Sequence, residues 1–240
     1  MKTALPRTVV VLGVVSFFTD FSSEMIYPLL PAFLTGVLGA GAAALGLIEG
    51  VAESTASLLK VYSGRWTDRT QRRKPFILGG YSLAGAVRPL IGLATSWTVV
   101  LGLRFLDRVG KGLRTAPRDA LIADAVPEAQ RGRAYGFHRS LDHAGAVVGP
   151  LAAAALLALE GVSLRHVFLL AALPAAVVVV LIVLGIRESP RAAPNATGWG
   201  VCAIVPWALT RKLSFSIPIC PPASRPGWPS LRITPKPYWN

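Results

Sequence analysis

Six long apolar segments constrain the fold of this chain more than any other feature of its sequence. They run over Val9–Leu38, Ala40–Ser63, Pro75–Leu93, Ser96–Val126, Ala134–Leu159 and Val167–Ile186. An α-helix needs about 20 residues to cross the hydrocarbon core of a membrane, and each segment is close to that length or longer. The apolar residues do not alternate with polar ones, as they do in the strands of membrane barrels. We therefore predict an all-α membrane protein with a bundle of six transmembrane helices.

The predicted helices divide the chain into a six-helix unit, 1–188, and a tail, 189–240. We expect the helices at about 8–36, 40–64, 75–94, 97–125, 133–159 and 165–187. The first segment follows two basic residues, as the apolar part of a signal peptide does. It continues past Asp20 to Gly36, however, with no clean cleavage site after it. We therefore expect a retained first helix.

The basic residues of the six-helix unit indicate its orientation. Five of them lie in the gap at 65–74, and Arg131 and Arg133 end the gap between the fourth and fifth segments. The gaps at 36–41 and 94–97 carry no charge. Because basic loops stay in the cytoplasm, we predict that both ends of the unit are cytoplasmic and that the protein lies in the inner cell membrane. The net charge of +13 then reflects topology and not a nucleic-acid partner.

The composition changes abruptly after Glu188. No Asp or Glu follows, whereas ten of the 19 prolines, four of the six tryptophans and both cysteines do. Cys202 and Cys220 lack metal-ligand spacing, and Val201–Leu209 is too short to span a membrane. We predict a Pro-rich, disordered tail of the kind that a shifted reading frame would produce. The alternative is a Pro-rich docking segment.

Three stretches combine glycines with charged residues at defined spacings. They read GRWTDRTQRRK at 64–74, LRFLDRVGKGLRTAPRDALIADAVPEAQRGRA at 103–134 and GFHRSLDHAGAVVGPLAAA at 136–154. In this order and spacing they resemble the loop, fourth-helix and fifth-helix signatures of the major facilitator superfamily. The resemblance covers the chain from Met1 to about Glu188.

The loop signature of that family is matched by five residues of the first stretch, with Gln71 in place of its second glycine. The five are Gly64, Asp68, Arg69, Arg72 and Arg73. In the fourth-helix signature Arg104 and Gly110 match. Asp107 and Arg108 stand where the family usually has Gln and Gly, and these two departures add charge.

The fifth-helix stretch keeps the spacing of the family's antiporter-type signature at Gly145, Gly149 and Pro150. Alanines replace the last two glycines of that signature. Small residues let membrane helices approach closely, so Gly136, Gly145 and Gly149 also predict helix packing, and Pro150 predicts a bend.

The resemblance implies a secondary transporter of two six-helix halves that moves solute by alternating access. The chain carries the first half, and we predict proton-coupled efflux of a small, unidentified solute across the lipid bilayer. One alternative is a truncated fragment that does not transport. Another is a half-size protein that forms a homodimer in place of the missing carboxyl-terminal half. We find no catalytic, phosphate-loop or metal motif, and predict neither an enzyme nor a cofactor.

Charged residues within the apolar segments are the candidate solute and proton pathway, because charges inside a bilayer are costly and face the bundle interior. They are Asp20, Glu24, Glu49, Glu53, Arg104, Asp107, Arg108 and Lys111. Arg104, Arg108, Lys111, Arg114 and Arg118 share one helix face, which we call the basic stripe. Further charges are Lys60, Arg88, Arg139 and Asp142.

We expect the basic stripe to pair with the acids of the first two helices, and Arg104 to pair with Asp20 or Glu24. One or more of these acids would then carry a proton. The first alternative is a static ion-pair network. In the second, Arg114 and Arg118 extend to the cytoplasmic headgroups. In the third, the stripe faces an open cavity and attracts anions.

Overall fold

The computed structural model of the chain describes residues 4–70 and 73–185. The predicted tail at 189–240 and Arg72 of the loop signature lie outside the described residues. Within the described part all regular structure is helical.

The first membrane span is a helix whose last third is irregular. Helix α1 (Arg7–Glu24) is followed by one turn of 3₁₀-helix, η1 (Tyr27–Leu29), a short α2 (Leu30–Ala32) and one turn of π-helix, η2 (Phe33–Val37). Pro28 and Pro31 explain the break, because a proline has no N–H to donate to the preceding turn.

The other spans follow the predicted segments closely. They are α3 (Ala42–Thr70), α4 (Lys74–Leu90) with η3 (Ile91–Leu93), α5 (Trp97–Asp124), η4 (Glu128–Gln130) with α6 (Arg131–Leu157), and α7 (Leu164–Leu170) with α8 (Ala172–Gly185). The clearest difference is in α3, which continues to Thr70 instead of ending near residue 64. The loop-signature residues Gly64, Asp68 and Arg69 therefore lie on the last turns of a helix.

Five of the six spans are long and apolar enough to cross a membrane, and they form a multi-pass membrane protein. The span that fails this test is α5, which is long enough but carries the basic stripe. Its charges must therefore be compensated or solvated inside the bundle. The prediction of an all-α bundle of six transmembrane helices is confirmed.

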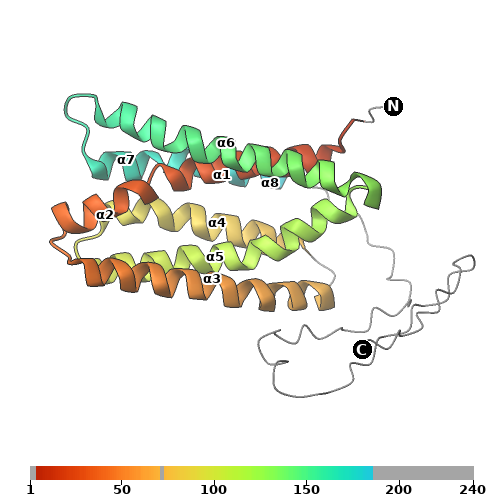
Figure 1. Cartoon of the computed structure of the whole chain (residues 1–240), viewed down its shortest axis with the longest axis horizontal. Coiled ribbons are helices and arrows are strands. Elements are labelled where there is room, and N and C mark those ends of the chain that lie inside the picture. Colours follow the sequence, from red (N-terminus) through yellow and green to blue (C-terminus); the bar gives the residue numbers. More distant parts are fainter. Residues whose placement is uncertain (1–3, 71–72, 186–240) are drawn as a thin grey trace, which may run out of the picture. The chain divides into compact units, whose positions relative to one another are not determined.

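The helices pack as two sets of three, joined mainly where α4 meets α8 (Figure 1). One set is α1 with α6 and α8, and the other is α5 with α3 and α4. The spans are buried in the bundle to different extents. In the α3 span and in the α6 span, 17% of the most apolar 18-residue window is buried, whereas 56% of that window is buried in the first span.

Two apolar cores lie at opposite ends of the bundle. One contains Phe33, Ile91 and Phe168, and the other contains Val9 and Ile182. The residues of α1, α4 and α5 that lie between these two groups along each helix include most of the buried polar and charged side chains. A polar layer therefore separates two apolar cores.

Two glycines of the fifth-helix signature bring α6 against α1. A Cβ atom at Gly145 would collide with the carbonyl oxygen of Phe17, and one at Gly149 would come within 2.8 Å of the carbonyl oxygen of Phe21. The prediction for Gly136 is wrong within the described bundle, because a Cβ atom there would meet nothing within 4 Å. Pro150 lies inside α6.

Replacing Gly145 by alanine tests this contact. We expect Gly145→Ala to lower the free energy of unfolding by about 1–3 kcal/mol or more, because the methyl group meets backbone that cannot move aside. Gly136→Ala is the matched control, and should be neutral or stabilising because alanine favours a helix by roughly 0.5–1 kcal/mol. Unfolding in mixed detergent micelles measures both, and equal effects would contradict the close approach of α1 and α6.

Candidate functional site

The basic stripe of α5 does not lie in one uniform environment. Arg104, Arg108, Arg114 and Arg118 are buried, whereas Lys111 is exposed. The beginning of the stripe meets acids and an aromatic ring, and its end lines a cavity. We call the first region the ion-pair cluster, formed by Tyr27, Glu49, Arg88, Arg104, Asp107 and Arg108. We call the second region the basic cavity.

Asp107 is the central acid of the ion-pair cluster. Its side chain is fully buried, and its Oδ1 accepts a hydrogen bond from Nε of Arg88 at 2.9 Å. Its Oδ2 accepts a hydrogen bond from the hydroxyl of Tyr27 and lies 3.7 Å from Nη1 of Arg104. Asp107 therefore ties α4, α5 and the segment after α1 together through buried polar contacts.

Tyr27 also offers its ring to the arginines. The guanidinium carbon of Arg104 lies 3.9 Å from the ring centroid, and those of Arg108 and Arg88 lie at 5.3 and 5.9 Å. A cation beside an aromatic face is attracted by roughly 0.5–2 kcal/mol, more when both groups are desolvated. The ring of Tyr27 thus helps to stabilise the positive charges of three arginines, which outnumber the one fully buried acid, Asp107.

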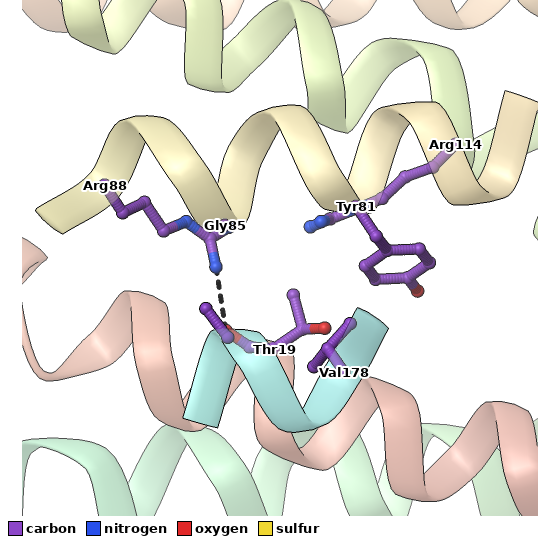
Figure 2. A pocket seen from close by; sticks show the side chains of 7 residues that line it. Thr19, Tyr81, Gly85, Arg88, Arg114 and Val178 are labelled. Carbon is purple, nitrogen blue, oxygen red and sulfur yellow. Dashed lines mark hydrogen bonds between the residues drawn. The ribbon is translucent and has the colours of Figure 1, made fainter. Parts of the chain in front are cut away.

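Arg88 extends from α4 across the bundle interior. Its Nη1 donates a hydrogen bond to the backbone oxygen of Thr19 on α1 at 3.0 Å (Figure 2). The same small pocket contains Arg114, whose guanidinium carbon lies 4.2 Å from the ring centroid of Tyr81. The pocket leaves no room for a water molecule. It is therefore part of the packed interior and not a binding site.

Arg104 pairs with an acid of the second span, not with an acid of the first. Its Nη2 lies 2.5 Å from Oε1 of Glu49. The expected pairing with Asp20 or Glu24 is absent from the described residues. The reason is register, because antiparallel α1 and α5 bring Arg104 level with Tyr27 and bring Arg114 level with Asp20.

The basic cavity lies among α1, α3, α5 and α6 and has a volume of about 320 Å³. Its lining combines five cations with three acids and a few small residues. The lining residues are Asp20, Glu53, Ala56, Ser57, Lys60, Lys111, Arg114, Thr115, Arg118, Arg139 and Asp142. Of the predicted pathway residues, the structure brings Asp20, Glu53 and Lys111 together here.

Two acids of the cavity, Asp20 of α1 and Asp142 of α6, line it side by side and interact electrostatically. Asp142 also accepts a hydrogen bond from the hydroxyl of Ser16, and its Oδ2 lies 3.4 Å from Nη1 of Arg139. Two carboxylates that share a site repel each other when both are ionised, which favours a proton on one of them. The pair is therefore a group that can hold a single proton.

The remaining predicted residues lie outside both regions. Glu24 is half-buried at the end of α1, where a Cβ atom on Gly149 would come within 2.9 Å of its Cβ atom. Arg73, at the start of α4, forms an ion pair of 2.6 Å with Asp124 at the end of α5. The loop signature thus contributes a contact between helix ends.

Sequence reasoning missed Tyr27 and Ser16 and did not include Arg88 in the pathway. Neither hydroxyl carries a charge, so the search for intramembrane charges could not find them. Arg88 was visible as a lone cation in an apolar segment, and its position opposite Asp107 depends on helix packing.

Comparison with known proteins identifies relatives of the chain. A family model described as Major Facilitator Superfamily matches residues 12–235. An uncharacterised MFS-type transporter of Methanocaldococcus jannaschii is 41% identical over 145 residues, which cover 60% of this chain and 36% of the relative. The multidrug resistance protein MdtH of Enterobacter sp. is 30% identical over 127 residues, which cover 53% of this chain and 31% of the relative.

Among solved structures, the chain is similar to a bacterial homologue of the human lysosomal transporter Spinster in an inward-facing, unoccupied conformation. The TM-score is 0.66 at 21% identity, and the match covers 82% of this chain and 46% of that one. This likeness shows the fold. The chain spans half or less of the length of these relatives.

A double-mutant cycle tests which acid Arg104 contacts. We expect Arg104→Gln and Glu49→Gln to couple by about 0.5–3 kcal/mol in the free energy of unfolding, because each removes one side of the same contact. Arg104→Gln with Asp20→Asn is the control pair and should be additive within roughly 0.5 kcal/mol. Coupling to Asp20 without coupling to Glu49 would contradict the observed register of α1 and α5.

Proposed function

Because the chain belongs to the major facilitator superfamily, we propose that it acts as a secondary transporter that couples proton movement to the efflux of a small solute. The observation that carries this proposal is the basic cavity, where acids from α1, α3 and α6 lie among cations from α3, α5 and α6. A cavity between helices that holds both titratable acids and fixed cations can bind a solute and a proton in the same place.

The Asp20–Asp142 pair supports the proton-coupled part of the proposal. The two acids come from different helices and line the same cavity. Alternating access rocks one six-helix half against the other around a fixed site, so the water and cations that reach this pair change during the cycle. A proton bound by the shielded pair would leave when the pair meets water or a cation, which couples the proton to the transport cycle.

Two observations support efflux as the direction of transport. The relatives include MdtH, whose name describes a multidrug resistance protein. In addition, Gly145 and Gly149 keep the spacing of the antiporter-type signature that this stretch resembles, and they bring α6 against α1.

The exposed faces of α3 and α6 support a second six-helix unit in the working transporter. Both helices expose polar side chains near the middle of their length, including Glu53 and Lys60 on α3 and Arg139 and His143 on α6. Such groups are costly against lipid. We propose that a second copy of the chain, or a carboxyl-terminal half, covers them in the inner membrane, with both ends of the unit cytoplasmic. The alternative is a fragment that does not transport.

Proton movement in proteoliposomes tests the proposal. We expect an imposed gradient of at least one small solute, from a panel of organic anions, cations and sugars, to move protons through the purified chain. Asp142→Asn should abolish this movement, because an amide cannot take up the shared proton. Glu160→Gln removes one acid from an exposed turn outside the cavity and is the matched control.

A failure of every solute on the panel to move protons would contradict the transporter and favour the non-transporting fragment. Cross-linking in the same proteoliposomes tests for the second six-helix unit. If a second copy of the chain supplies this unit, we expect a dimer when the chain is expressed alone.

A further inference from the structure

We propose that the basic cavity selects solutes with an anionic group, a carboxylate or a phosphate, and that Lys60 and Lys111 bind this group beside the buried charge of Arg114. The inference rests on the proposed transport function, and it names the chemical class of the solute.

The charges of the cavity do not balance. Five cations line it against three acids, Asp20, Glu53 and Asp142. Arg139 lies against Asp142, and Arg118 forms an ion pair of 2.9 Å with Asp119, which is not part of the lining. Lys60, Lys111 and Arg114 form no ion pair within 4.0 Å among the described residues. The excess positive charge is therefore concentrated on these three side chains.

Arg114 is a donor that the protein itself leaves unsatisfied. The residue is 5% exposed and lines the cavity, and its Nη1 has no hydrogen-bond partner in the described part of the chain. The ring of Tyr81 attracts its guanidinium carbon but accepts no strong hydrogen bond from Nη1. Nη1 is fully enclosed and the guanidinium lies in the tight pocket beside Tyr81, so Arg114 adds a permanent positive charge next to the cavity and does not donate into it.

The ion-pair cluster shows why the anion belongs at this end of the stripe. There Arg88 and Arg104 form ion pairs with Asp107 and Glu49, Arg108 lies 5.3 Å from the ring centroid of Tyr27, and the adjoining pocket is too tight for water. In the basic cavity the corresponding space is open, with about 320 Å³ between the walls. That volume lies within the range of roughly 300–1,000 Å³ typical of sites for small molecules.

Lys60 comes from α3 and Lys111 from α5, with Arg114 one turn further along α5. The two lysines thus approach the cavity from two helices, as a clamp on a charged group requires, and Arg114 adds its charge behind them. Guanidinium and ammonium groups together suit carboxylate and phosphate oxygens. The anionic group can belong to a soluble solute or to a lipid headgroup, and both have the same chemistry at this site.

Ligand-induced stabilisation of the purified full-length chain tests the inference. Inorganic phosphate and succinate are titrated in an uncharged detergent, with potassium chloride at equal ionic strength as the reference. We expect at least one of the two to raise the melting temperature. Lys111→Gln and Lys60→Gln should each weaken the apparent affinity by about tenfold or more, the loss expected for one charge-assisted hydrogen bond. Arg65→Gln, which removes a cation from α3 outside the cavity, should leave the affinity unchanged.

A second arm compares nanodiscs of phosphatidylcholine with nanodiscs that contain phosphatidylglycerol. Stabilisation by phosphatidylglycerol that disappears in Lys111→Gln and Lys60→Gln identifies a headgroup as the source of the anion. The inference is overturned if no anionic probe or lipid stabilises the chain, or if the two lysine variants bind as Arg65→Gln does.

Binding is measured without a gradient, so the two proposals fail separately. Anion binding without proton movement overturns the transport function and leaves the anion site. Proton-coupled movement of a neutral or cationic solute, unchanged in Lys111→Gln, overturns the anion site and leaves the transport function.

Discussion

A carboxylate buried among membrane helices requires a cation beside it, and Asp107 meets this requirement with Arg88 at 2.9 Å. The same carboxylate accepts a hydrogen bond from Tyr27, so one buried acid holds α4, α5 and the broken end of the first span in register. The contact lies between two apolar cores, where no water is available to replace a lost partner. Span α5, too charged to cross a membrane alone, is placed in the bundle by this contact.

The environment of the rest of the basic stripe depends on how far along α5 the neighbouring acids and aromatic rings extend. Glu49 and Tyr27 compensate Arg104, whereas beyond Arg108 the stripe lines the basic cavity. One helix therefore performs two tasks. Its first half contributes to stability through paired charges, and its second half presents Lys111 and Arg114, which form no ion pair within 4.0 Å among the described residues. Asp20 of α1 and Asp142 of α6, which can titrate, line the same cavity as the cations from this second half of α5.

The sequence was sufficient for the architecture and for much less of the site. Apolar length predicted the spans, and the spacing of the stripe indicated one charged face on α5, because both depend on a single helix at a time. Partners between helices depend on vertical register and rotation, which a single sequence does not contain. For this reason Glu49, rather than Asp20 or Glu24, is the partner of Arg104. Tyr27 escaped notice because a tyrosine in an apolar segment looks like any other aromatic residue. Gly136 matched a packing pattern, yet it faces away from every described neighbour.

The division of α5 into a paired half and an open half is the central claim, and two substitutions on that helix test it most directly. Asp107→Asn and Lys111→Gln each remove one charge with little change in size. The account predicts that the first lowers the free energy of unfolding by about 3–5 kcal/mol, since it leaves Arg88 buried without its acid. It predicts that the second changes this free energy by no more than roughly 0.5 kcal/mol, as expected for an exposed residue without an ion pair. Losses of equal size, or a larger loss for Lys111→Gln, would contradict the division.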